Sequence, residues 1–322
     1  MKILFMGTPD FAVPSLNALV EQSYEVVGVV TQIDRPKDRG HALKASPVKN
    51  YATSQSIPVL QPKKLSKEPD MIQTLRQLNP DLIVTCAFGQ LLPQSVLDIP
   101  RLGTINVHGS LLPKYRGAAP IQWAIIIGEA KTGITTMFTD IGLDTGDMLL
   151  KDEIDIPINM TAGELYDVMS AQGAKTLIRT INALEEGSIV RTKQDNSQAT
   201  YAPKVDKETG RIDWTQTSRK IHDLIRGTTP WPSAFSEFCG CKARIWRSEL
   251  VENKNDCSDN SLVSSNALPG TVLKLESSCM CVKTGDGVLH IPEIQVDSCK
   301  RMTPKQYACG HELKVGMVFN ER

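Results

Sequence analysis

An amide and an imidazole two residues apart are the first side chains that could carry chemistry. They are Asn106 and His108, in the run INVHGSLLPKYRGAAP at residues 105–120. Alternation along a strand places both polar side chains on one face and their apolar neighbours on the other. The strand ends at Gly109, and burying either polar group without a partner is costly. Because ligands bind at the carboxyl edge of open α/β sheets, we interpret the pair as part of a reaction site rather than as a packed structural histidine.

A second set of candidate residues lies in the turn DIGLDTGDML, residues 140–149. Asp140, Asp144 and Asp147 surround two glycines between predicted strands. A calcium loop would need oxygen ligands at regular alternate positions and a terminal glutamate, which are missing. Taken alone, the turn is equally well explained as an ordinary polar loop. Close to His108, however, a carboxylate from this turn would orient the imidazole and stabilise its cationic form.

A long loop after the second predicted strand concentrates positive charge. Residues 34–49, DRPKDRGHALKASPVK, include the cations Lys37, Arg39 and Lys44. One interpretation is a solvated surface, which is what most charged runs are. The other is a binding segment for an anionic, phosphate-bearing partner, because the loop follows a strand at the same edge of the sheet.

Length and composition indicate a globular protein of two domains. The chain has 322 residues, of which 41% are hydrophobic, and its 36 cationic side chains balance 36 acidic ones. A neutral total says nothing about a polyanionic partner, since only the distribution of charge could. The first residues show no long apolar run before a cleavage site, and no stretch reaches the roughly 18 apolar residues of a membrane span. We therefore expect a cytoplasmic protein with no membrane partner, and we expect it to be a monomer.

Eight cysteines raise the question of a metal site. Seven of them follow residue 238, but their pairs are spaced C-x-C, and His290 and His311 do not complete a familiar set of zinc ligands. We expect free thiols in a cytosolic protein and no metal.

The order of predicted elements indicates an α/β fold. From KILFMG to GTINVH, apolar strands alternate with helical stretches, which is the pattern of βαβ units and hence of a parallel sheet. Segments 134–140 and 147–156 predict an antiparallel addition to that sheet. A capping box formed by Thr161 and Glu164 opens a long helix, which Gly187 ends.

Two domains and a linker follow from these patterns. Residues 1–188 should form a Rossmann-like catalytic domain with a mostly parallel sheet, and the polar residues 189–208 should form a linker. Residues 209–322 contain short strands broken by Gly, Pro, Asn and Ser, which predicts a small OB-like antiparallel β-barrel. The turn after the first strand reads MGTPDFA and lacks G-x-G-x-x-G, so a nicotinamide or flavin cofactor is disfavoured.

One strand of the predicted barrel has a basic side. Lys242 and Arg244 project from one face while Ala243 and Ile245 occupy the other, and Arg247 follows. Such a stripe is compatible with contacts to a nucleic-acid backbone.

Together these motifs resemble the signature of the formyltransferases that use 10-formyltetrahydrofolate. The runs INVHGSLLPKYRGAAPIQWAI and TDIGLDTGDM carry the resemblance. MGTPDFAVPSL, the DRPKDRG loop with SPVK, and the predicted barrel are similar to the branch that acts on methionine esterified to initiator tRNA. The resemblance covers essentially the whole chain, and the core positions show no departure from it.

The resemblance implies a formyl donor, an acceptor and a role for particular residues. The donor would be 10-formyltetrahydrofolate and the acceptor initiator Met-tRNA, with no metal. Asn106 and His108 would stabilise the oxyanion that forms when the amine attacks the formyl carbon, and Asp144 would tune His108. The folate would contact Phe88, Gln90, Leu91, Leu92, Ser110, Leu111, Leu112, Pro113 and Asp140. The tRNA would contact Lys37, Arg39, Lys44, Lys204, Lys242, Arg244 and Arg247.

Other functions remain open at this point. Another folate-dependent formyltransferase or hydrolase acting on a small acceptor would share the Asn-His-Asp set. A glycinamide ribonucleotide formyltransferase has no need of the basic loop or the second domain. Hydrolase modules and sugar-nucleotide formyltransferases normally continue into a further catalytic domain, which we do not expect here. An RNA-binding barrel on an idle Rossmann scaffold would give no reason to bury Asn106 and His108 unpaired.

Overall fold

Packing divides the chain into two compact units that do not follow chain order. The computed structural model describes residues 1–36, 43–250 and 266–319. The first unit comprises Met1–Pro120, Lys131–Asp155 and Tyr166–Ala202, and the second comprises Ile121–Ala130, Ile156–Leu165 and the described residues from Pro203 onward. Two short segments that precede residue 166 therefore pack with the second unit, whereas the sequence suggests domains that are continuous.

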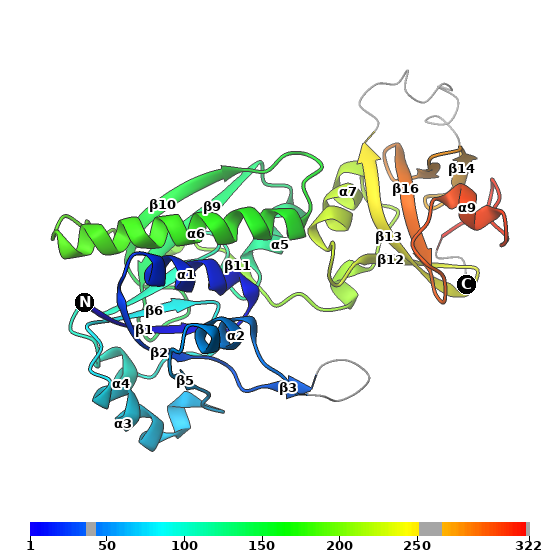
Figure 1. Cartoon of the computed structure of the whole chain (residues 1–322). Helices are drawn as coiled ribbons and strands as arrows, with labels where there is room; N and C mark the ends of the chain where they lie inside the picture. Colours follow the sequence, from blue (N-terminus) through cyan, green and yellow to red (C-terminus); the bar gives the residue numbers. More distant parts are fainter. Residues whose placement is uncertain (37–42, 251–265, 320–322) are drawn as a thin grey trace. The chain divides into compact units, whose positions relative to one another are not determined.

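The first unit is built on a sheet of seven strands in the order β10-β9-β7-β6-β1-β2-β5 (Figure 1). The strands are β1 (Lys2–Gly7), β2 (Glu25–Val30), β5 (Val59–Leu60), β6 (Leu82–Cys86), β7 (Thr104–His108), β9 (Lys131–Phe138) and β10 (Met148–Asp155). Neighbours from β7 to β5 run parallel, while β9 is antiparallel to both β7 and β10. The predicted Rossmann-like sheet and its antiparallel addition are confirmed.

Helices cover the two faces of this sheet. They are α1 (Val13–Glu21), α2 (Pro47–Ser54), α3 (Pro69–Gln77), α4 (Gln94–Leu97) and α6 (Ala162–Glu185). In Figure 1, α6 lies on one side of the sheet, and α3 and α4 lie on the other. Leu75 of α3 and Val96 of α4 pack in one apolar cluster with Leu4 of β1. On the opposite face α6 approaches β7 closely, since a Cβ added to Gly173 would lie 3.1 Å from Val107.

Over β9 and β10, a loop covers the α3–α4 face of the sheet. Leu112, from the loop that follows β7, packs against Met137 of β9 and Met148 of β10. Thr85 and Asn106 lie side by side in the parallel pairing of β6 and β7. Polar groups of β7 can therefore meet a ligand on this face, because loops are more easily shaped around a ligand than packed helices.

Helix α6 begins and ends where the sequence predicts. The backbone N–H of Thr161 donates to Glu164 Oε2 over 2.8 Å, and the Glu164 N–H donates back to Thr161 Oγ1 over 3.3 Å. The helix ends at Glu185, and Gly187 adopts a positive φ of 69°. Glycine enters this left-handed region without the steric cost that a Cβ brings.

Two small two-stranded sheets complete the first unit. They are the antiparallel pair β3 (Arg35–Pro36) and β4 (Leu43–Lys44) and the parallel pair β8 (Arg116–Gly117) and β11 (Tyr201–Ala202). Thr192 also forms an antiparallel bridge with Met148. The first part of the segment expected to be a linker, residues 189–202, is therefore paired with the first unit.

The second unit contains a five-stranded antiparallel sheet in the order β12-β13-β16-β15-β14. Its strands are β12 (Ala234–Phe238), β13 (Cys241–Leu250), β14 (Val272–Leu275), β15 (Met280–Lys283) and β16 (Val288–Val296). Its helices are α5 (Pro120–Ile127), α7 (Ser218–Gly227) and α9 (Pro304–Ala308). The predicted antiparallel domain is confirmed. Within the described residues, no ladder joins the edge strands β12 and β14.

Aromatic rings form the centre of the second unit's core. The ring centroids of Trp214 and Phe319 are 5.2 Å apart, and those of Phe238 and Phe319 are 4.8 Å apart.

Across the part of the chain that the structure describes, no helix has the length and apolarity needed to cross a membrane.

Candidate active site

Strand β7 carries the amide and the imidazole, and β6 orients the amide. The hydroxyl of Thr85 donates to Asn106 Oδ1 over 2.9 Å. Because this bond occupies the carbonyl end of the amide, the Nδ2 hydrogens are the donors that Asn106 can offer to a bound molecule. Sequence reasoning did not single out Thr85, because its contact with Asn106 depends on the register between two strands.

The imidazole of His108 is held between a backbone carbonyl and a carboxylate. His108 is 6% exposed, and its Nε2 lies 3.0 Å from the carbonyl oxygen of Tyr115. A carbonyl oxygen only accepts hydrogen bonds, so Nε2 carries a proton. Nδ1 lies 3.8 Å from Asp144 Oδ2. That separation is too long for a hydrogen bond but short enough for the carboxylate to stabilise an imidazolium ion electrostatically.

Asp144 is fixed by its own backbone and by the loop after β7. Its Oδ2 accepts a hydrogen bond from the Gly117 N–H over 2.8 Å, and its φ is 54°. Asp is one of the residues that tolerate this left-handed region. Two residues on, a Cβ added to Gly146 would lie 1.8 Å from the Phe138 carbonyl oxygen. The path of the turn therefore requires glycine at position 146, and this path brings the carboxylate to His108.

Loop 110–113 is held from beneath by two strands. Thr135 Oγ1 donates to the Ser110 carbonyl over 2.7 Å and accepts from the Leu112 N–H over 3.2 Å. Lys151 Nζ donates to the Leu112 carbonyl over 2.6 Å, and partial burial lowers the pKa of this amine. Ser110 and Leu112 are buried, while Leu111 and Pro113 are partly exposed. Of the four predicted folate contacts in this loop, Leu111 and Pro113 have accessible side chains.

The predicted folate contacts at 88–92 differ from one another in how far their side chains are exposed. Phe88 and Leu92 are buried in the apolar cluster under α3 and α4. Gln90 uses its side chain to hold residues 62–65, accepting from the Leu65 N–H over 2.8 Å and donating to the Pro62 carbonyl over 3.2 Å. Leu91 is 66% exposed. Gln90 is partly exposed, so a contact that needs the backbone is required only for the buried Phe88 and Leu92.

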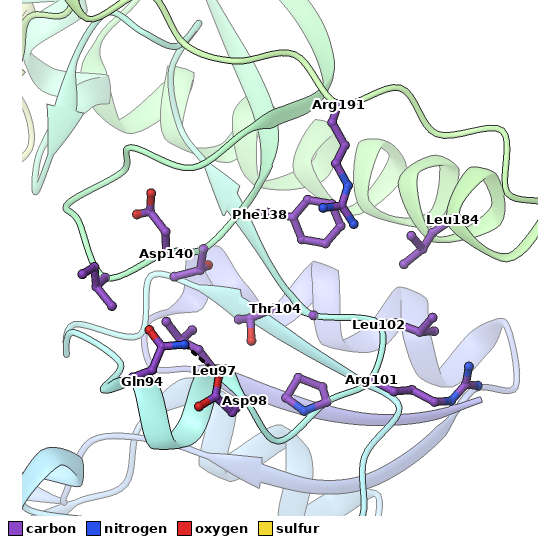
Figure 2. A pocket seen from close by; sticks show the side chains of 14 residues that line it. Gln94, Leu97, Asp98, Arg101, Leu102, Thr104, Phe138, Asp140, Leu184 and Arg191 are labelled. Carbon is purple, nitrogen blue, oxygen red and sulfur yellow. Dashed lines mark hydrogen bonds between the residues drawn. The ribbon is translucent and has the colours of Figure 1, made fainter.

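An open groove of about 610 Å³ crosses the first unit beside the start of β7 (Figure 2). It lies between α4 with the turn that follows, the end of β9 with residues 139–141, and Leu184 and Arg191. Asp140, a predicted folate contact, lines it, and the Arg191 guanidinium stacks over the Phe138 ring at 4.2 Å from its centroid.

Two hydroxyls of this groove are buried and have no hydrogen-bond partner among the described residues. They are Thr104 Oγ1 and Thr139 Oγ1. Thr104 is 2% exposed and occupies the same side of β7 as Asn106. A buried polar group without a partner is unfavourable, so these two hydroxyls suit a polar ligand edge. The parity of Thr104 with Asn106 is the sequence signal that could have found it.

The predicted tRNA contacts are only partly described. Lys37 and Arg39 lie outside the described residues, and Lys44 and Lys204 are exposed. In β13, burial of Ala243 and Ile245 leaves Lys242 and Arg244 on the other side, as the alternation predicts.

Each cation of β13 also has an intramolecular partner. Lys242 Nζ lies 3.4 Å from the Phe235 ring centroid, and Arg244 pairs with Asp297 over 3.1 Å. Arg247 pairs with Glu249 over 3.2 Å. RNA contacts for these residues remain predictions.

No metal site is evident in the described ranges. There, no three side chains of His, Cys, Asp or Glu gather as ligands. The seven cysteines in those ranges are free thiols, and Cys257 lies outside them.

Comparison with known proteins identifies the class to which this fold and site belong. Residues 1–181 match the formyl transferase family, and residues 204–312 match the formyl transferase C-terminal domain. The chain therefore belongs to the formyl transferase family. It is 50% identical to the methionyl-tRNA formyltransferase of Acetivibrio thermocellus over 321 residues, which cover 100% of both chains. The corresponding protein of Ruminiclostridium cellulolyticum is 49% identical, with 98% of each chain covered. The chain is thus an enzyme of the methionyl-tRNA formyltransferase branch, as the sequence motifs indicate.

Solved structures of more distant proteins share the fold. An N-formyltransferase from Helicobacter canadensis, in complex with folinic acid and dTDP-3-aminofucose, has a TM-score of 0.67 at 19% identity. The match covers 91% of this chain and 99% of that one. HypX from Aquifex aeolicus, in complex with tetrahydrofolic acid, has a TM-score of 0.60 at 19% identity, covering 100% of this chain and 51% of that one.

Proposed function

We propose that this enzyme transfers the formyl group of 10-formyltetrahydrofolate to the α-amine of methionine on initiator Met-tRNA, as a cytoplasmic monomer. The observation that carries the proposal is the arrangement of Asn106, His108 and Asp144. An amide donor and an imidazole project from one strand, and a carboxylate faces the imidazole at 3.8 Å. This set suits the development of negative charge on a carbonyl oxygen.

The reaction needs no protein nucleophile. The methionine amine attacks the formyl carbon, and its oxygen becomes an oxyanion in the tetrahedral intermediate. Asn106 Nδ2 donates a hydrogen bond to this oxygen. The positive charge of a protonated His108, whose ring nitrogens face the Tyr115 carbonyl and the Asp144 carboxylate, stabilises the oxyanion electrostatically. Collapse of the intermediate breaks the bond between the formyl carbon and N10. N10 receives the proton that the amine loses, so the products are the formylated amine and tetrahydrofolate.

The folate is assigned to the loops that cover β7 and to the groove. Leu111 and Pro113 offer accessible apolar contacts beside His108, and Leu91 offers another. The groove with Thr104 and Thr139 provides buried hydroxyls for the polar edge of the pterin. Few polar groups at fixed positions in a mainly apolar setting are typical of cofactor-sized sites.

A tRNA acceptor is better supported than a small one. The two relatives compared above carry the name methionyl-tRNA formyltransferase and match over nearly their whole length. The resemblance to sugar formyltransferases is at 19% identity and concerns the fold. Among the predicted tRNA contacts that the structure describes, Lys44 and Lys204 are exposed and form no ion pair with a described residue.

The proposal is tested by a transfer assay with purified protein. We expect formylation of charged initiator tRNA, with slower formylation of elongator Met-tRNA. His108→Ala should lower turnover by at least about 100-fold, because it removes the positive charge that stabilises the oxyanion. Full activity of His108→Ala, or a preference for glycinamide ribonucleotide or an amino sugar nucleotide, would contradict the proposal.

A further inference from the structure

Gln194 links the turn that carries Asp144 to the loop that follows His108. We infer that Gln194 is a positioning residue for the transfer reaction and acts by holding Asp144 opposite His108. The inference rests on the proposed function, and it concerns a residue in the segment that the sequence suggests is a linker.

The amide of Gln194 uses its full hydrogen-bonding capacity. Its Nε2 donates to the carbonyl oxygens of Asp144 and Gly146, each over 2.8 Å. Its Oε1 accepts from Arg116 Nε over 3.0 Å and from Nη2 over 2.8 Å. Gln194 is also the one partly buried residue in the otherwise exposed run 191–198. An amide with two donated and two accepted bonds has a fixed position, and it fixes the groups around it.

Hydrogen bonds hold the Asp144 turn from two sides. The backbone carbonyls of residues 144 and 146 are clamped from one side, while the carboxylate accepts from the Gly117 N–H on the other. Gly117 directly follows Arg116, which is bonded to Gln194. Gln194 therefore closes a ring of contacts that sets the distance from the carboxylate to the loop after β7.

The same segment fixes the other partner of His108. Thr200 Oγ1 accepts from the Tyr115 N–H over 2.8 Å, and the Thr200 carbonyl accepts from the Arg116 N–H over 2.9 Å. The Tyr115 carbonyl is the acceptor for His108 Nε2. Residues 194–200 thus position both groups that face the imidazole, which are the Tyr115 carbonyl and the Asp144 carboxylate.

Loss of the Gln194 donors should impair the chemical step rather than binding. Without them the turn is free to relax, and the carboxylate moves relative to Nδ1 of His108. Electrostatic stabilisation falls with distance, and a shift of about 1 Å at a catalytic group can cost about 100-fold in rate. No contact to folate or tRNA is assigned to Gln194, so the Michaelis constants should stay unchanged.

Three variants of the full chain test the inference. Gln194→Met keeps the length of the side chain and removes all four bonds. Gln194→Glu keeps the acceptor for Arg116 and removes both donors to the Asp144 turn. Gln198→Met is the matched control, because Gln198 is exposed and its amide donates to Asp195, away from the Asp144 turn. We expect kcat to fall about 10- to 100-fold in both Gln194 variants. The Michaelis constants for folate and tRNA should match those of Gln198→Met.

The outcomes separate this inference from the proposed function. A wild-type enzyme that does not formylate Met-tRNA contradicts the proposed function. With an active wild type, normal kcat in Gln194→Met overturns the inference, and so does restored kcat in Gln194→Glu, since the donors are then dispensable. A raised folate Michaelis constant with normal kcat also overturns it, because Gln194 would then serve binding.

Discussion

At the scale of single residues, the site separates groups aimed at substrate from groups that hold them. Thr85 fixes the oxygen of the Asn106 amide and leaves its nitrogen to donate to a ligand, whereas the His108 ring is held on both sides, by the Tyr115 carbonyl and the Asp144 carboxylate. Thr104 differs, because its buried hydroxyl has no partner among the described residues. A group that is fixed on one side and unpaired on the other is prepared for a ligand at little cost in side-chain entropy.

Thr104→Val separates a ligand contact from a packing defect. Valine has nearly the same shape and lacks the hydroxyl, so the free protein should gain about 1 kcal/mol in unfolding free energy. If the hydroxyl bonds to the folate, the Michaelis constant for 10-formyltetrahydrofolate should rise about fivefold with kcat unchanged. Steady-state kinetics and thermal melting measure the two effects.

Thr136→Val is the matched control for that change. Thr136 is also fully buried, but its hydroxyl is bonded to Thr180 Oγ1 over 2.8 Å on the face covered by α6. This variant should lose stability and keep its folate Michaelis constant. A stabilised Thr104→Val with unchanged kinetics would rule out the groove residue as a folate contact.

The residues that sequence reasoning found and missed differ in how far their partners lie along the chain. Asn106 and His108 follow from local alternation, and Asp144 follows from the family motif. Thr85 and Gln194 could not be found this way, because their contacts join positions 21 and 50 residues apart. Such contacts depend on strand register and on the path of a loop, which no local pattern specifies.

At the scale of elements, the parallel sheet was the part most open to prediction. Its buried strands read as continuous apolar runs, and the cap of α6 is a local signal. The division into two units could not be predicted in this way, because α5 and residues 156–165 pack with the second unit but lie between elements of the first unit in the chain. Their place is set by buried contacts within the second unit. One of these contacts joins His222 of α7 to the Ile158 carbonyl over 2.9 Å.

His222 should make the stability of the second unit depend on pH. Burial lowers its pKa from the usual 6.5, although the bond to Ile158 opposes this, and Ser248 Oγ lies 3.0 Å from Nδ1. The folded state therefore holds the imidazole neutral. Its contribution is complete above the unfolded pKa of about 6.5 and is lost as pH falls below that value toward the lower folded pKa.

His222→Gln tests this dependence, because glutamine does not titrate. Wild type should be more stable than the variant at about pH 7.5, and the difference should shrink by about pH 5.5. Calorimetry of the full chain at both pH values measures it. A stability difference that is independent of pH would show that the folded protein accommodates the charged imidazole.

At the scale of the whole molecule, the two units have separate tasks in the proposed reaction. The Asn-His-Asp arrangement lies entirely within the first unit, and the basic side of β13 lies within the second. The net charge of the chain is zero, so attraction of tRNA has to come from local cations. Arg244 is such a cation, but it is paired with Asp297 over 3.1 Å. Its value for RNA binding depends on whether that pair opens.

The pair Arg244 and Asp297 gives opposite predictions for its two members. Arg244→Ala removes a phosphate contact, so the Michaelis constant for tRNA should rise about threefold and its salt dependence should weaken by about one counterion. Asp297→Asn releases the guanidinium and removes a negative charge, so the same constant should fall or stay level. The folate constant should be unchanged in both variants, because folate is assigned to the first unit. A parallel loss of tRNA affinity in the two variants would instead mean that the ion pair itself maintains the surface, and Arg244 would no longer count as an RNA contact.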